Sequence, residues 1–456
     1  MGQDFLKLMM DILSQPAVLI ALISFVGLMI QKKPASDVIK GTTKSFLGFI
    51  VIAAGAGILV SSLEPFGLMF QEAFNVNGVV PNNEAIVAMA LSEYGSATAL
   101  IMFFGMLANI LIARFTSFKY IFLTGHHTLY MACMIAVILV VAGMEGFMLV
   151  FVGSLALGFI MAFFPALAQP FMRKIIGNDS VGFGHFSTLG YALSGAVGSV
   201  VGKNSRSTEK INFPKGLGFL RDSSVSIALT MTILYVIVAL FAGSSYIESE
   251  LSGGTQYLVF SVIQAVTFAA GVFIILAGVR LVLAEIVPAF KGISSKLVPN
   301  AKPALDCPIV FPYAPNAVLI GFFCSFLGGL VGMAILGAIG AVIILPGVVP
   351  HFFTGATAGV FGNATGGIRG ATIGSFLNGL LITFLPVFLM PVLGDLGFAN
   401  TTFSDSDFGA AGIVLGNAAK YFGAMGLSIM VIGIVALSVI WSLIRKNKNK
   451  DQSISA

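Results

Sequence analysis

Runs of about 20 mainly apolar residues recur along the whole chain and limit the folds it can adopt. The segment from Phe147 to Ala168, for example, contains no charged residue. A helix needs about 20 such residues to cross a bilayer. Hydrophobic residues fill 57% of the 456 positions and charged residues only 9%, more apolar surface than a soluble domain can bury. The sequence therefore predicts an all-α polytopic membrane protein, since a membrane β-barrel would show short alternating strands.

Lys and Arg collect between the apolar runs and indicate the orientation, because basic residues favour cytoplasmic loops. Residues 64–113 and 222–279 contain no basic residue and are expected to begin or lie outside, whereas 32–44 and 203–221 are basic. The N-terminus is then outside, and the basic tail from Arg445 is cytoplasmic. These positions predict eleven spans: about 16–31, 46–63, 97–113, 120–144, 147–168, 225–243, 257–283, 314–336, 338–356, 370–394 and 423–444.

Short motifs return at a spacing of about 225 residues. Residues 52–65, which end in Glu64-Pro65, resemble 275–288, and their last prolines are 288 − 65 = 223 positions apart. The same offset takes Asn83 to Asp306. Two further pairs resemble each other: 122–126 with 352–356, and 183–185 with 408–410. The first motif runs outward and its copy inward, so two inverted repeats are predicted, with a site between them.

The predicted division follows from this repeat and from the basic connector. The first repeat covers residues 1–202 with five spans, and the second covers 225–444 with six. The cytoplasmic connector is 203–224 and the cytoplasmic tail is 445–456. Four stretches fit no span, and we interpret them as re-entrant or interfacial segments that build the site: 68–96, 182–201, 286–312 and 409–420.

Polar and ionisable residues interrupt the apolar sequence near these repeated motifs. His126 and His185 suit a polyhydroxylated ligand or a proton relay, because a neutral imidazole offers one donor and one acceptor. Each could instead cap local backbone or face an interfacial water. Asp306 lies between two prolines, and a carboxylate at membrane depth usually marks a pathway or a binding group. It could also cap a half-helix, which is compatible with binding. Asn83 occupies the matching position in the first half.

Several other classes of function are excluded by absent signals. The 24 Lys and Arg are few for this length, so the net charge of +5 reflects topology and predicts no nucleic-acid partner. The three cysteines match no metal or disulfide spacing. No Walker motif, catalytic triad or zinc spacing is present, which argues against an ATP-driven pump and a self-contained enzyme. We expect no cofactor and no resident metal.

At the candidate positions the sequence resembles the IIC permease family of the bacterial ascorbate phosphotransferase system. The resemblance covers about residues 16–444. Its motifs are Ile39-Lys-Gly-Thr42, Thr124-Gly-His126, Gly182-Phe-Gly-His185, Val279-Arg-Leu-Val-Leu-Ala-Glu285, Ala304-Leu-Asp306-Cys307 and Ala314-Pro-Asn-Ala317.

The resemblance implies a homodimer in the bacterial inner membrane, with a mobile core domain and a fixed scaffold domain. It implies elevator-like translocation of L-ascorbate or a related sugar, which a cytoplasmic IIB protein, itself served by IIA, then phosphorylates. This chain would be the carrier and not the kinase. The implied substrate contacts are Asn83, Glu84, His126, His127, Thr128, Leu129, Tyr130, His185, Phe186 and Asp306.

The chain departs from that family pattern at four of these contacts. Asn83-Glu84 stands where the ascorbate carriers have Thr-Tyr, and Tyr130 and Phe186 each replace a Gln. Loss of hydrogen-bond partners changes selectivity strongly at a polar ligand. The identity of the sugar is therefore the most open part of the prediction. The alternative is a secondary transporter driven by H⁺ or Na⁺, with Asp306 or His126 as the coupling group.

Overall fold

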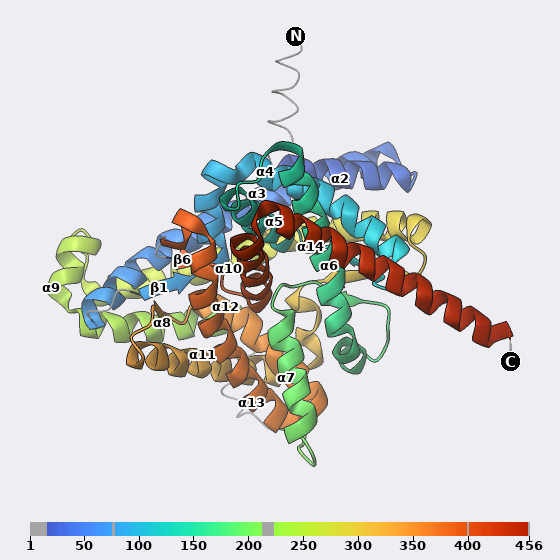
Figure 1. Cartoon of the computed structure of the whole chain (residues 1–456). Coiled ribbons are helices and arrows are strands. Elements are labelled where there is room, and N and C mark those ends of the chain that lie inside the picture. The colour runs from blue at the N-terminus through green and yellow to red at the C-terminus, as the bar shows by residue number, and fades with distance from the viewer. Residues whose placement is uncertain (1–15, 75–77, 212–222, 399–400, 455–456) are drawn as a thin grey trace, which may run out of the picture.

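The computed structural model describes residues 16–74, 78–211, 223–398 and 401–454, and within these ranges the chain is mainly helical. Figure 1 shows long helices that cross at large angles, with the last helix leaving the body of the molecule toward the C-terminus. The helices are α2 (Pro16–Ile30), α3 (Ala35–Phe74), α4 (Asn83–Phe115), α5 (Gly125–Val141), α6 (Gly146–Ile176), α7 (Thr188–Val201), α8 (Ser223–Ala242), α9 (Ser244–Tyr246), α10 (Tyr257–Leu297), α11 (Pro315–Ala338), α12 (Val348–Pro350), α13 (Ala356–Leu389) and α14 (Ser406–Ile454).

The helices pack in two groups. In the first, α3 lies against α10, and both contact α2 and α8. In the second, α13 packs on α7 and α11, α4 packs on α5 and α6, and α14 contacts α5, α6 and α13. The largest buried apolar cluster belongs to the second group and is centred on α5, whose residues from His127 to Leu139 are all buried.

Five helical segments among the described residues are long and apolar enough to cross a membrane. They are Glu93–Phe115, Gly146–Ile176, Pro315–Ala338, His351–Val392 and Ser406–Arg445. The pair Met231–Ala242 and Ser244–Leu251 is bent by 100° and is either one broken span, which would be the sixth, or a re-entrant loop. The helical membrane class is thus supported, while the count of eleven stays a prediction.

Two of the predicted spans differ from the structure. Residues 120–144 begin with a strand, β2 (Tyr120–Phe122), and only Gly125–Val141 among them is helical. Residues 338–356 do not form a single helix, because α11 ends at Ala338 and the strand β5 (Ile343–Ile344) follows. Gly340 has φ +68°, a left-handed conformation that interrupts a helix, and Pro346 and Gly347 follow soon after. The next helical stretch starts at Val348, passes through a π-helical turn (η6, His351–Gly355) into α13, and breaks again at Gly367.

Three of the four stretches predicted as re-entrant join a helix to a short strand. Residues 68–96 contain the end of α3, the strand β1 (Gly78–Pro81) and the start of α4. Residues 286–312 contain the end of α10, the strand β4 (Lys302–Leu305) and two short 3-10 turns, η4 (Cys307–Ile309) and η5 (Phe311–Tyr313). Residues 182–201 contain β3 (Gly182–Phe183) and α7, whereas 409–420 lie within α14 before its break at Gly423.

Within the described part of the chain, six short strands form two parallel sheets. In one sheet β4 lies between β2 (Tyr120–Phe122) and β3, with Phe122 and Gly182 both in register with Ala304. In the other, β1 lies between β5 and β6 (Thr401–Thr402). Each sheet thus takes its central strand from one part of the chain and both outer strands from the other.

Two of the motif pairs found in the sequence do not occupy equivalent places. Phe122 lies in strand β2 but Phe352 lies in a π-helical turn, and Phe183 lies in strand β3 but Phe408 lies inside α14. The prediction that these similar motifs occupy equivalent positions in the two repeats is therefore wrong. Asn83 and Asp306 do match, because each comes within two residues of the end of a central strand.

Candidate functional site

The β2–β4–β3 sheet brings the predicted site residues together. His126 and His127 follow β2 at the start of α5, Asp306 follows β4 directly, and His185 follows β3 by two residues. The strands are parallel, so their carboxyl ends meet at one edge of the sheet. Three segments that are far apart in the sequence therefore deliver their polar side chains to one place.

The close approach of β3 and β4 depends on Gly184. Its backbone N–H donates to the Leu305 carbonyl at 2.8 Å, and its own carbonyl accepts a hydrogen bond from the Thr124 hydroxyl. A Cβ at position 184 would lie 2.6 Å from the Ala304 oxygen. Only glycine allows this contact, and it places His185 against the start of α5.

His126 and Asp306 form the first pair of the site. Nε2 of His126 lies 3.7 Å from Oδ2 of Asp306, and the two side chains are 14% and 8% exposed. The other Asp306 oxygen accepts a hydrogen bond from the Cys307 backbone N–H at 2.7 Å, at the start of η4. One carboxylate oxygen is thus held by the protein and the second faces the imidazole.

A second carboxylate, Asp405, faces the other two imidazoles. Its Oδ2 lies 3.8 Å from Nδ1 of His185 and 4.0 Å from Nε2 of His127. The His127 and His185 rings are 3.9 Å apart between centroids. His127 Nδ1 accepts from the Phe186 backbone N–H at 3.4 Å, so its ring proton lies on Nε2, toward Asp405.

His185 has a further polar partner in Tyr191 of α7. The Tyr191 hydroxyl lies 2.8 Å from Nδ1 of His185 and 3.7 Å from the sulfur of Cys307. Tyr191 is fully buried among Phe183 and Phe361. This aromatic packing fixes the hydroxyl, and the hydroxyl in turn orients the imidazole.

Asp405 follows a strand of the second sheet and is not among the site residues that the sequence predicts. It follows β6 in Ser404-Asp405-Ser406-Asp407, and Asn83 of α4 holds the segment by accepting from the Ser404 N–H at 2.9 Å. The sequence does carry a signal for this site. Asp405 and Asp407 stand just before a long apolar run, in a chain where only 9% of the residues are charged. Carboxylates in such a position are costly unless they have a function or partners.

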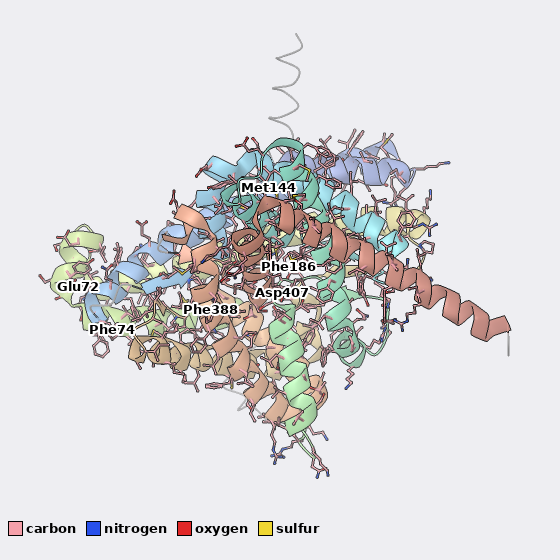
Figure 2. All side chains as sticks on the ribbon, in the orientation of Figure 1. Glu72, Phe74, Met144, Phe186, Phe388 and Asp407 are labelled. Carbon is pink, nitrogen blue, oxygen red and sulfur yellow. The ribbon has the colours of Figure 1, made fainter. Side chains whose placement is uncertain are left out.

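Asp407 joins two helix N-termini. Its carboxylate accepts from the backbone N–H groups of Thr188 and Leu189, at 2.8 and 2.9 Å, which are the first residues of α7. In return, the Ser187 hydroxyl accepts from the Ser406 N–H at 3.2 Å, at the start of α14. Figure 2 shows Phe186 and Asp407 in the middle of the molecule. This reciprocal capping sets the separation of His185 and Asp405.

The remaining predicted contacts lie near the site but have partners within the protein. Phe186 is fully buried and stacks on Phe122 at 4.5 Å, and Leu129 belongs to the main apolar cluster. The Thr128 hydroxyl donates to the Thr124 carbonyl, and the Tyr130 ring lies 5.7 Å from that of His126. The side chain of Glu84 lies outside the described residues. Substrate contact by these residues stays a prediction.

His351, the fourth histidine, belongs to a separate buried polar group. Its Nδ1 lies 2.9 Å from the Ser325 hydroxyl, which also accepts from the Asn378 amide at 3.3 Å. No contact between His351 and the other three histidines is present among the described residues.

The spacing of the site residues would also suit a divalent metal ion. The ligand atoms of His127, His185 and Asp405 all lie within 4.8 Å of one another, as do those of His126, His127 and Asp306. However, Nδ1 of His185, the atom nearest Asp405, already bonds to Tyr191. A ligand with several hydroxyl groups can use the same donors and acceptors without displacing that bond.

The apolar helices with a buried polar site define a multi-pass membrane protein. Comparison with known families then identifies the class: residues 11–407 match the PTS system sugar-specific permease component, EIIC-GAT. The chain therefore belongs to this family of phosphotransferase transport subunits, as the sequence motifs predicted.

The chain is also similar to a curated member of the phosphotransferase permeases. The ascorbate-specific PTS system EIIC component of Mycoplasma pneumoniae is 24% identical over 415 residues, which cover 77% of this chain. The chain matches 61% of the length of that relative.

Proposed function

We propose that this chain is the membrane permease component of a bacterial phosphotransferase system for L-ascorbate or a related sugar. The observation that carries the proposal is the convergence of three imidazoles, His126, His127 and His185, with the carboxylates of Asp306 and Asp405. Imidazoles donate and accept, and carboxylates accept from hydroxyl groups. Such a set suits a small polyhydroxylated ligand, with Asn83 supporting the Asp405 segment.

Two inverted halves explain how the chain builds this site. All three imidazoles come from residues 1–202 and both carboxylates from 225–444. The two sheets exchange strands reciprocally, β4 pairing with β2 and β3 while β1 pairs with β5 and β6. A two-fold relation between the halves accounts for this pattern. The chain would sit in the bacterial inner membrane with its N-terminus outside and its C-terminus in the cytoplasm.

An elevator movement explains how a ligand leaves so enclosed a site. The α2, α3, α8 and α10 group would be the scaffold through which two copies dimerise, and the group that holds the site would be the mobile core. The core would carry the sugar to the cytoplasmic face, where a IIB protein phosphorylates it. The permease needs only to present the sugar hydroxyl, so phosphoryl transfer requires no group of this chain.

Binding to the purified protein tests the site. Ascorbate, pentitols and hexitols are titrated by calorimetry into the parent protein and into two variants, Asp306→Asn and His185→Ala. The control is the variant Asp395→Asn, because Asp395 is exposed. We expect a 10- to 100-fold weaker affinity in the first two variants, because each loses a hydrogen bond that involves a charged or buried group (about 1.5–3 kcal/mol). A variant that binds as tightly as the parent removes its residue from the site, and no binding of any of these ligands contradicts the sugar assignment.

A secondary transporter driven by H⁺ is the second candidate, because the His126–Asp306 pair could also carry a proton. Uptake is measured in vesicles with and without the phosphotransferase proteins. The permease accumulates sugar phosphate only when they are present. Accumulation without them that an uncoupler abolishes would favour the secondary transporter.

A further inference from the structure

A basic cavity lies away from the candidate site, between the end of α4 and the part of α14 around Arg445. It has a volume of about 650 Å³, and its lining residues include Arg114, Lys119 and Arg445. The two candidate spans Glu93–Phe115 and Ser406–Arg445 both end at this cavity. In Figure 1, α14 passes α4 on its way to the C-terminus. The cavity therefore lies at the level where hydrocarbon gives way to the polar interface.

The walls of the cavity combine positive charge with exposed apolar surface. None of its described lining residues is acidic, and three are basic. Phe115 and Leu443 also line it and are 58% and 53% exposed. Thr116, Ser117 and Ser442 also line the cavity, and the hydroxyl groups of Thr116 and Ser442 donate within the protein, to the carbonyls of Ile112 and Ser438. An occupant with both an anionic group and an apolar part would match these walls.

The cavity is held by specific contacts between the segments that form it. The Ser442 hydroxyl of α14 accepts a hydrogen bond from the Ser117 backbone N–H at 2.8 Å. The Lys119 ammonium donates to the carbonyls of Ala113 and Arg114, at 2.8 and 3.0 Å, at the end of α4. Pro299 and Asn300 close the side next to α10. These bonds join α14 to the loop after α4 and hold the Lys119 ammonium at the end of α4.

From this arrangement we propose that the cavity binds the phosphate of an anionic phospholipid, whose acyl chains lie along Phe115 and Leu443. Basic pockets between helix ends recognise such headgroups, and arginine matches phosphate with two parallel hydrogen bonds. The apolar lining favours a lipid over free phosphate, since a phosphate ion has no apolar surface to bury against Phe115 and Leu443.

Native mass spectrometry of the detergent-purified full chain tests this site. The probes are phosphatidylglycerol, phosphatidylcholine and inorganic phosphate at matched concentrations. The variants are Arg114→Gln with Arg445→Gln, the charge-conserving Arg114→Lys with Arg445→Lys, and the control Lys203→Gln with Lys210→Gln. The control residues are exposed and lie in the connector, and their replacement changes the net charge equally.

We expect one tightly retained phosphatidylglycerol on the parent and on the control, and about a fivefold lower affinity for each arginine removed. The lysine variant should keep most of the binding, which shows that charge at this place matters and that the fold is intact. Equal retention of phosphatidylcholine, or unchanged binding in the glutamine variant, would overturn the proposal. Displacement of the lipid by millimolar phosphate would instead identify an inorganic anion site.

Discussion

Asp405 stands between two imidazoles, and its removal is the most direct test of the site at the scale of one residue. Asp405→Asn replaces a carboxylate oxygen that faces His127 and His185 with an amide. We expect sugar affinity to fall about 10- to 100-fold, because one acceptor for ligand hydroxyls is lost. Calorimetric titration measures this, with Asp395→Asn as the exposed control, and unchanged affinity would show that Asp405 only supports the histidines.

Asp407 acts on the site through position and not through contact with a ligand. Asp407→Ala leaves the N–H groups of Thr188 and Leu189 without their acceptor, at about 1–3 kcal/mol each. We expect weaker sugar binding, with Asp407→Asn intermediate because its amide oxygen can still accept.

Imidazole NMR separates this positioning role from a general loss of stability. The chain has four histidines. In Asp407→Asn the ring signals of His127 and His185 should shift, while those of His351, bonded to Ser325, should not. Equal shifts at all four rings would indicate a general disturbance.

At the scale of elements, the contact between β3 and β4 decides whether His185 reaches the other groups. Gly184→Ala introduces a Cβ 2.6 Å from the Ala304 oxygen and should destabilise the protein by about 1–3 kcal/mol. The control is Gly57→Ala in α3, where a Cβ would meet nothing within 4 Å. Thermal unfolding of both variants tests this, and equal melting temperatures would mean that the strands separate without cost.

The length of an element decides whether a sequence pattern can predict it. A run of apolar residues such as 147–168 identifies α6 because its length alone distinguishes it from a strand. The strands β3, β5 and β6 have two residues each, too few for any periodic signal. The apolar character of residues 338–356 predicts a span, but Gly340, Pro346 and Gly347 break it.

At the scale of the whole molecule, an ion-pair group centred on Asp179, which lies beyond the end of the candidate span Gly146–Ile176, ties α6 to β4. Asp179 accepts from Arg173 at 2.8 Å and from Lys302 at 2.5 Å. The hydrogen bond from Arg173, and then that from Lys302, holds the pKa of Asp179 well below its ordinary value. A lowered carboxyl pKa stabilises the fold above the ordinary pKa, and this stability is lost as pH falls through the lowered pKa.

Asp179→Asn should therefore melt at a lower temperature than the parent at pH 7. The side chain of Asp179 is 47% exposed, so we expect a loss below about 1 kcal/mol. The two melting curves should approach each other as the pH falls below about 4. Melting temperatures of both proteins between pH 3 and pH 8 check this, and a difference that grows toward low pH would contradict it.

The sequence by itself determined the helical membrane class and the family, and it singled out His126, His185 and Asp306, three groups of the candidate site. These follow from local signals: apolar runs, and rare polar residues that stand out within them. Only the tertiary structure decided that Asp405 joins them, that Asp407 spans two helix ends, and that the strands pair across the chain. Such pairing depends on contacts between segments more than 120 residues apart, such as Phe122 with Ala304, and no local pattern specifies them.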